Sequence, residues 1–219
     1  RDDVKKDSQD MISERNALGY IGGSDAARVH GGWETKTFRE FWDERLTGMK
    51  TKEFSTIHTV AGNIMEGYIL EAVGVDREYW NVFKQKEGTM AGINTDAFDG
   101  VIYHEAKNIL LNEASKWVFG YSIPSVYMYQ IQHGMYVLDI DEVNFHVCLV
   151  TPEEKENPFL VTDVKSKTHT FRFNRSYFDK TKVTMPMYAA FIEYLTECYN
   201  NKSYPTDARK KEIINSFNS

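Results

Sequence analysis

The clearest periodic pattern in the sequence lies between Thr56 and Val73. At about 100° per residue, Glu71 falls near the apolar stripe of this segment and Glu66 falls opposite it. We therefore expect a helix whose protein-facing side carries Glu71 and whose solvent-facing side carries Glu66. Its apolar residues recur every three or four positions, as on one face of an α-helix: Ile57, Val60, Ala61, Ile64, Met65, Tyr68, Ile69 and Ala72.

Other segments predict helices around a sheet. Residues 97–111 indicate a β-hairpin that turns near Gly100 to His104, or one strand that bends there. The segment "SIPSVYMYQIQHGMYVL" has Pro124 in its first turn and is apolar on nearly every side, which is typical of a buried helix. An inner strand "EVNFHVCLV", a half-exposed strand "KTHTFRFNR" and helices in "TFREFWDERLTG" and "MPMYAAFIEYLTECYNN" complete the pattern. Helices that flank a central mixed sheet favour an α/β (α+β) fold.

The size and composition of the chain limit its class. A length of 219 residues suits a single domain. We expect an arm or short helix over 1–14, a motif-bearing core over 19–150, and a basic strand region with a C-terminal helix over 151–219. Cys148 and Cys198 form no CxxC motif, so neither a disulfide framework nor a zinc knuckle is indicated. No apolar run approaches the roughly 18 residues that span a bilayer, and we expect a soluble, intracellular protein with no membrane partner.

The stretch "DAFDGVIYHEAKNILL" places charged residues in a segment that otherwise has strand character. Glu105 and Lys107 are two residues apart on the predicted strand, so their side chains share a face. Asp99 lies beside Gly100, which permits a tight turn or bulge that brings this acid to the same face. Two carboxylates suit Mg²⁺, and an adjacent ammonium can orient a water molecule and offset charge on phosphorus. A surface ion pair on an edge strand is the alternative interpretation.

Three further polar residues support a site. A carboxylate directed into the protein, as predicted for Glu71, needs a metal ion or a buried salt bridge. Gln130 and Gln132 interrupt the aromatic and apolar segment "YMYQIQHGMYV". Buried amides need hydrogen-bond partners, which a hydrated metal and phosphate site supplies. The alternative is that these glutamines bond a neighbouring backbone edge.

The segment "IGGSDAAR" resembles an anion site. Its glycines precede a predicted helix start and can present backbone N–H groups to a phosphate, with Ser24 as a further donor. Arg28 closes the segment and supplies a positive charge for the same phosphate. An ordinary helix N-cap is the alternative interpretation. Together with the acidic pair, these residues predict a phosphodiester site.

Four motifs in order carry a family resemblance. "YIGGSDAARVHG", "MEGYILEAV", "DAFDGVIYHEAK" and "YMYQIQHGMYV" resemble the YqaJ-like viral recombinase and lambda exonuclease family. The resemblance spans about Gly19 to Val150. It implies the PD-(D/E)xK nuclease fold, a three-layered core with a mixed sheet. Phe98 stands where the family often has proline, and Arg15 matches the family arginine only with a shifted loop.

The resemblance implies an alkaline-type deoxyribonuclease, a phosphodiesterase that is also a Mg²⁺-dependent exonuclease with Mn²⁺ as a possible substitute. It implies digestion of one strand of linear double-stranded DNA from the 5′ end, leaving 3′ overhangs for a single-strand annealing protein. The positions that match Asp99, Glu105 and Glu71 hold metal in such enzymes, Lys107 serves the attacking water, and Gln130 supports the centre. It also implies a trimeric ring around DNA, in the host cytoplasm if a phage encodes the chain. The residues assigned to substrate phosphate are Ser24, Arg28, Arg15 and Gln132.

A basic segment offers further DNA contacts. Between residues 165 and 182 six cations face one acid, and a solvated strand face is the alternative interpretation. The formal net charge of −6 argues against a generally adhesive nucleic-acid binder, since non-specific binding needs local positive charge. The cations assigned to weak DNA contact are Lys165, Lys167, Arg172 and Arg175.

Two other functions remain open at this stage. One is a different PD-(D/E)xK enzyme, such as a structure-specific endonuclease, which would cut closed circular DNA. A Cas4-like exonuclease normally carries four cluster-binding cysteines, and this chain has two. The other is a non-catalytic module that binds DNA ends, although such a module has no need for Asp99, Glu105 and Lys107 together.

Overall fold

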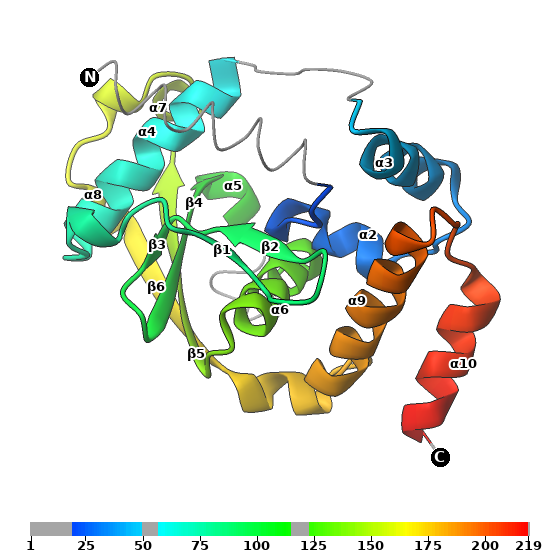
Figure 1. The fold of residues 1–219 in the computed structure, drawn as a ribbon. Coiled ribbons are helices and arrows are strands. Elements are labelled where there is room, and N and C mark those ends of the chain that lie inside the picture. The colour runs from blue at the N-terminus through cyan, green and yellow to red at the C-terminus, as the bar shows by residue number, and fades with distance from the viewer. Residues whose placement is uncertain (1–18, 50–56, 115–122, 219) are drawn as a thin grey trace.

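The computed structural model describes residues 19–49, 57–114 and 123–218 (Figure 1). The predicted arm over 1–14 and Arg15 lie outside this described part of the chain. No helix within the three described segments is long and apolar enough to cross a membrane.

A mixed sheet of four strands, in the order β3-β4-β5-β6, forms the centre of the molecule. β3 (Ala97–Phe98) is antiparallel to β4 (Ile102–Leu110), which runs parallel to β5 (Glu142–Val150). β6 (Thr168–Asn174) pairs antiparallel with β5 at the other edge. The predicted hairpin, inner strand and half-exposed strand are therefore confirmed, and β5 is buried because helices cover both faces of the sheet there.

Two helices cover opposite faces of this sheet. α4 (Ile57–Ala72) packs Met65 and Ile69 against Ala106 and the β5 residues around Cys148. α6 (Ser125–Leu138) lies on the other face, where Tyr127 contacts Phe145. The arrangement of helix, mixed sheet and helix confirms the predicted α+β class and the three-layered core (Figure 1).

The larger part of the core extends from α6 to the helices grouped beside α9 (Figure 1). α9 (Met185–Asn200) has a proline in its first turn. Proline is favoured there because the N–H group that it lacks would have no partner within the helix. α3 (Lys36–Thr47) ends at Gly48, whose φ of +69° suits glycine. The remaining elements are η1 (Gly23–Asp25), α2 (Ala26–His30), η2 (Arg77–Tyr79), β1 (Phe83–Gln85), β2 (Gly92–Asn94), α5 (Leu111–Ala114), α7 (Pro152–Glu156), η3 (Pro158–Leu160), α8 (Val164–Lys167), η4 (Arg175–Lys180) and α10 (Asp207–Asn218).

The last helix, α10, was not expected from the sequence. Its segment is mostly polar, so the apolar repeat that predicts a helix is weak. Lys210 fixes it instead, because its buried Nζ donates to the carbonyl oxygens of Val29 at 2.8 Å, His30 at 2.8 Å and Gly31 at 2.5 Å. A lysine that caps the last carbonyls of α2 also complements the helix dipole.

A histidine pair crosses the sheet on the face covered by α4. His104 Nδ1 and His146 Nε2 are 3.0 Å apart, and His146 Nδ1 is 2.8 Å from the Thr170 hydroxyl. Burial lowers the pKa of His146 to about 4, and the neighbouring His104 adds to this shift. Burial also lowers the pKa of His104, although Asp99 opposes the shift. Both rings are therefore neutral in the folded protein at neutral pH.

We predict a loss of stability in mild acid that depends on His146. A histidine with a lowered folded-state pKa contributes stability above its unfolded pKa of about 6.5, and this contribution is lost as the pH falls toward about 4. The contribution should be about 3 kcal/mol. Urea unfolding at several pH values from 7.5 to 4.5 should give a shallower pH slope for His146→Gln than for the wild type. Equal slopes would contradict this assignment.

Candidate active site

The site is built around two charged residues of β4. Glu105 and Lys107 lie two residues apart on the strand, so both side chains project from the α6 side of the sheet. The Glu105 side chain is only 2% exposed, whereas Lys107 is 25% exposed. Lys107 Nζ forms an ion pair with Glu105 Oε1. The predicted common face of this acid and lysine is confirmed.

A second carboxylate, Asp96, joins the pair through the β3–β4 hairpin. Ala97 pairs with His104, so the same register places Asp96 opposite Glu105. Asp96 Oδ2 accepts a hydrogen bond of 2.7 Å from the backbone N–H of Ala106, and it lies 4.0 Å from Lys107 Nζ. Two acids and one amine therefore converge at one point of β4.

A third carboxylate reaches the cluster from α4. Burial raises the pKa of Glu66 to about 7, an effect that the Lys107 ammonium opposes and the Glu105 carboxylate reinforces. Burial raises the pKa of Asp96 as well, and Glu105 again adds to the shift. Burial and the neighbouring carboxylate thus both disfavour ionisation of these acids, and a positive ion bound between them would favour it.

The Glu105 carboxylate is fixed by hydrogen bonds at both oxygens. Gln130 Nε2, on α6, donates to Oε1 at 2.5 Å. The hydroxyl of Tyr103, two residues earlier on β4, donates to Oε2. The structure thus brings Gln130 to Glu105, as the sequence led us to expect, and it adds Tyr103.

Lys107 is protonated in this setting. Burial alone would lower its pKa, but the carboxylates of Glu105, Asp96 and Glu66 outweigh burial and hold the pKa of Lys107 above its usual value. Its ammonium can therefore donate hydrogen bonds and offset negative charge, but it cannot take up a proton.

The donor set fits a hard divalent cation. Asp96, Glu105 and Glu66 offer only carboxylate oxygens, which Mg²⁺ and Mn²⁺ prefer. Burial is the main cause of the raised pKa values of Glu66 and Asp96, and the Glu105 carboxylate adds to both, so a bound cation would offset these effects. Lys107 Nζ stands between two of these acids, and within the described residues no group of three or more His, Cys, Asp or Glu is already arranged to hold a metal ion. Metal binding would therefore shift Lys107 away from Glu105.

The structure does not place Asp99 in this cluster. Asp99 lies in the exposed turn between β3 and β4, where its Oδ1 accepts from the N–H groups of Val101 at 2.8 Å and Ile102 at 2.7 Å. These bonds lower the pKa of Asp99 although burial opposes them. The assignment of Asp99 as the acid that shares the face of Glu105 was therefore wrong, because the register selects the residue opposite Glu105.

The predicted orientation of Glu71 was also wrong. Its side chain is 60% exposed and pairs with Arg77, whose Nη2 is 3.1 Å from Glu71 Oε1. The buried stripe of α4 runs through Ala61, Met65, Ile69 and Leu70, while Val60 is 53% exposed. The packed face is thus rotated toward Leu70, which at i+4 lies within about 40° of Glu66.

The remaining predicted residues are dispersed. Gln132 is buried, and its Nε2 donates to the carbonyl of Val183 at 2.8 Å. The alternative interpretation, a hydrogen bond to the backbone, is therefore confirmed for Gln132, and its assignment to substrate phosphate was wrong. Ser24 is exposed on η1 beside Gly23, and Gly23 packs against Gln130. Of the four basic residues, Lys165 and Arg172 are exposed, Lys167 pairs with Glu154, and Arg175 pairs with Asp139 and Asp141.

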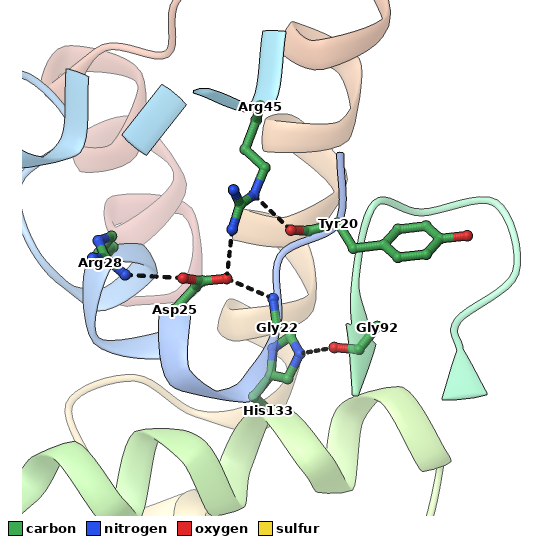
Figure 2. Close-up of polar contacts among 7 residues, drawn as sticks. All are labelled: Tyr20, Gly22, Asp25, Arg28, Arg45, Gly92 and His133. Carbon is green, nitrogen blue, oxygen red and sulfur yellow. Dashed lines mark hydrogen bonds and ion pairs between the residues drawn. The ribbon is translucent and has the colours of Figure 1, made fainter. Parts of the chain in front are cut away.

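The glycine segment near the site is held by a buried acid (Figure 2). Asp25 Oδ2 accepts from the Gly22 N–H at 2.9 Å and from Arg45 Nη2 at 3.0 Å, and Oδ1 accepts from Arg28 Nη1 at 2.9 Å. Arg45 also donates through Nε to the carbonyl of Tyr20 at 2.7 Å. Arg28, predicted to bind phosphate, is thus part of an ion-pair cluster that includes Arg45, a residue that sequence reasoning missed.

α6 supports the same segment from below. His133 Nε2 donates to the carbonyl of Gly92 on β2 at 2.9 Å (Figure 2). Its Nδ1 accepts from the Tyr188 hydroxyl at 2.8 Å. Ile21 bridges to Ala91 in parallel. The glycine segment, β2 and α6 are therefore packed as one unit beside Gln130.

Comparisons with known proteins agree with this architecture. No family model matches the chain, and no curated protein matches it. The solved structure of LHK-Exo in complex with dAMP superposes with a TM-score of 0.63 at 15% identity, over 89% of this chain and 93% of that one. A second structure, an alkaline exonuclease (LHK-Exo) from Laribacter hongkongensis, gives 0.56 at 14% identity, with 85% and 94% covered. A phage-related exonuclease from Haemophilus somnus 129PT gives 0.53 at 15% identity, with 84% and 96% covered. The chain has the fold of these exonucleases, which confirms the resemblance to the lambda exonuclease family at the level of the fold.

Proposed function

We propose that this chain, which has the fold of alkaline and phage-related exonucleases, is a divalent-metal-dependent nuclease that digests linear double-stranded DNA from its ends. One observation carries the proposal: Asp96, Glu105 and Lys107 converge on β4, with Glu66 from α4 and Gln130 from α6 around them. Carboxylates gathered around one protonated amine are what phosphodiester hydrolysis requires.

Each residue has a distinct role in this proposal. Asp96, Glu105 and Glu66 would hold Mg²⁺ or Mn²⁺, and a bound cation would supply charge to the phosphate and a more acidic water. Lys107 orients the attacking water and offsets charge on phosphorus, since its ammonium stays protonated. Water adds to phosphorus, the bond from phosphorus to the 3′ oxygen breaks, and the products carry a 5′-phosphate and a 3′-hydroxyl. Gln130 and Tyr103 keep Glu105 in place.

The family resemblance supports the finer parts of the proposal. They are digestion of the 5′-ended strand, a 3′ overhang that a single-strand annealing protein would receive, and a homo-oligomeric ring, a trimer in the family. Of the four basic residues assigned to DNA contact, Lys167 and Arg175 form ion pairs with acidic residues. Lys165 and Arg172 are exposed and could contact DNA phosphates.

A DNA-end-binding module without catalysis is the competing function. Against it stands the gathering of Glu105, Asp96 and Glu66 around the single ammonium of Lys107, because buried acids in excess of their cation are unfavourable unless a metal ion binds them. A binding surface for DNA would carry basic residues in that position.

The proposal is tested with linear duplex and closed circular DNA, incubated with Mg²⁺ or with EDTA. Separate 5′ and 3′ end labels on the linear duplex report the strand that is digested. We expect Mg²⁺-dependent loss of the linear DNA alone, with early release of the 5′ label. Cutting of circles would show an endonuclease, and binding without cleavage would show the end-binding module.

Two glutamates of α4 give a matched pair of variants. Glu66→Gln should reduce the rate of DNA digestion about tenfold or more, since it removes a carboxylate that interacts with Lys107 and Glu105. Glu71→Gln, five residues along the same helix, should leave the rate within about twofold because its side chain faces solvent. Initial rates at saturating Mg²⁺ decide between them, and a larger effect at Glu71 would contradict the site.

A further inference from the structure

The two oxygens of Glu105 have different partners. Oε2 accepts a hydrogen bond from the hydroxyl of Tyr103. Oε1 accepts a hydrogen bond of 2.5 Å from Gln130 Nε2 and forms an ion pair with the Lys107 ammonium. Tyr103 is fully buried, so no solvent competes for its hydroxyl proton. One oxygen of the carboxylate is thus held by a single buried donor, and the other is shared between Gln130 and the Lys107 ammonium, which a bound cation would displace.

The position of Tyr103 depends on a glycine of α6. A Cβ atom at Gly134 would lie 2.4 Å from Cε1 and 2.8 Å from Cδ1 of the Tyr103 ring. Such contacts do not occur between real side chains, so only glycine lets the ring lie against the helix. Gln130 and Gly134 are four residues apart and share a helix face, as Tyr103 and Glu105 share a strand face. The spacing on both elements therefore directs a tyrosine and a glutamine to one carboxylate.

We propose that Tyr103 is a positioning residue that leaves only Oε1 of Glu105 for a divalent cation and thereby favours Mg²⁺ over Ca²⁺. This inference rests on the proposed function of the same site. Mg²⁺ demands near-octahedral geometry and takes one oxygen per carboxylate readily, whereas Ca²⁺ is larger and accepts both oxygens of a carboxylate. A hydroxyl that holds Oε2 denies Ca²⁺ that second oxygen. Without the hydroxyl, Glu105 can offer both.

The test uses binding in the absence of DNA, so it does not depend on turnover. Isothermal titration calorimetry with MgCl₂ and with CaCl₂ gives the ratio of the two Kd values for the full chain. Tyr103→Phe should shift this ratio toward Ca²⁺ by about fivefold or more. Tyr188→Phe is the matched control, because it removes an equally buried hydroxyl that bonds His133 at 2.8 Å. Its ratio should equal that of the wild type.

Gly134→Ala provides a second variant that keeps the tyrosine hydroxyl but displaces the ring. It should shift the ratio in the same direction, which keeps the inference testable if Tyr103→Phe does not fold. Unchanged ratios in both variants, with both ions bound by the wild type, would overturn the role of Tyr103 alone. A wild-type chain that binds neither ion would overturn the proposed metal site and this inference with it.

Discussion

Asp96→Asn is expected to lower the rate of Mg²⁺-dependent DNA digestion by a factor on the order of a hundred or more. Asparagine keeps the size of the side chain and an oxygen for the Ala106 N–H, but it removes the charge that faces Lys107 at 4.0 Å. A neutral amide holds a divalent cation less well than a carboxylate does. The loss should therefore be in activity, with the fold retained.

Asp99→Asn is the matched control for that prediction. Asn keeps the oxygen that accepts from Val101 and Ile102 in the turn, and Asp99 is exposed. Its rate should stay within about threefold of the wild type. Single-turnover digestion of an end-labelled duplex at saturating Mg²⁺ measures both variants. If Asp99→Asn were the inactive one, the register argument for Asp96 would be contradicted.

Asp25→Ala is expected to destabilise the protein by about 3 to 5 kcal/mol. The substitution leaves the guanidinium of Arg45 buried without its carboxylate, and the Gly22 N–H loses its acceptor (Figure 2). An unpaired buried charge is far more unfavourable than a lost surface ion pair. The glycine segment beside Gln130 should lose its structure first, because Asp25 accepts hydrogen bonds there from Gly22, Arg28 and Arg45.

Urea unfolding followed by circular dichroism measures this loss. Asp76→Ala, at an exposed aspartate that precedes η2 and whose side chain makes no cap hydrogen bond to it, should change stability by less than about 0.5 kcal/mol. Arg45→Leu combined with Asp25→Ala should recover part of the loss, since no buried charge then remains at these two positions. A loss below about 1 kcal/mol for Asp25→Ala would show that the cluster is solvated.

The parts of the site that sequence reasoning found are those fixed by local spacing. Glu105 and Lys107 share a face because strand side chains alternate, and this holds whatever the strand pairs with. Gln130 stood out because an amide within an apolar helix needs a partner, and Glu105 is that partner. These inferences needed no knowledge of tertiary contacts.

The parts that it missed depend on register and rotation. Either acid of the hairpin could have faced Glu105, and only the pairing of Ala97 with His104 selects Asp96 over Asp99. The prediction for α4 took the buried face from the residues that recur every three or four positions, which include Val60 and omit Leu70. In the structure Val60 is exposed and Leu70 is buried. A shift of the packed face by less than a quarter turn exchanges Glu71 for Glu66. The error in the rotation of α4 is visible in the burial of Leu70, four residues after Glu66.

The most direct test of the proposed catalytic centre compares the wild type with Lys107→Ala on linear double-stranded DNA, with and without Mg²⁺. We expect Mg²⁺-dependent digestion by the wild type and almost none by Lys107→Ala, because the substitution removes the cation that pairs with Glu105 and Asp96. Lys84→Ala, at an exposed lysine of β1, should digest the duplex as the wild type does. Equal digestion by wild type and Lys107→Ala would contradict the assignment of this cluster as the catalytic centre.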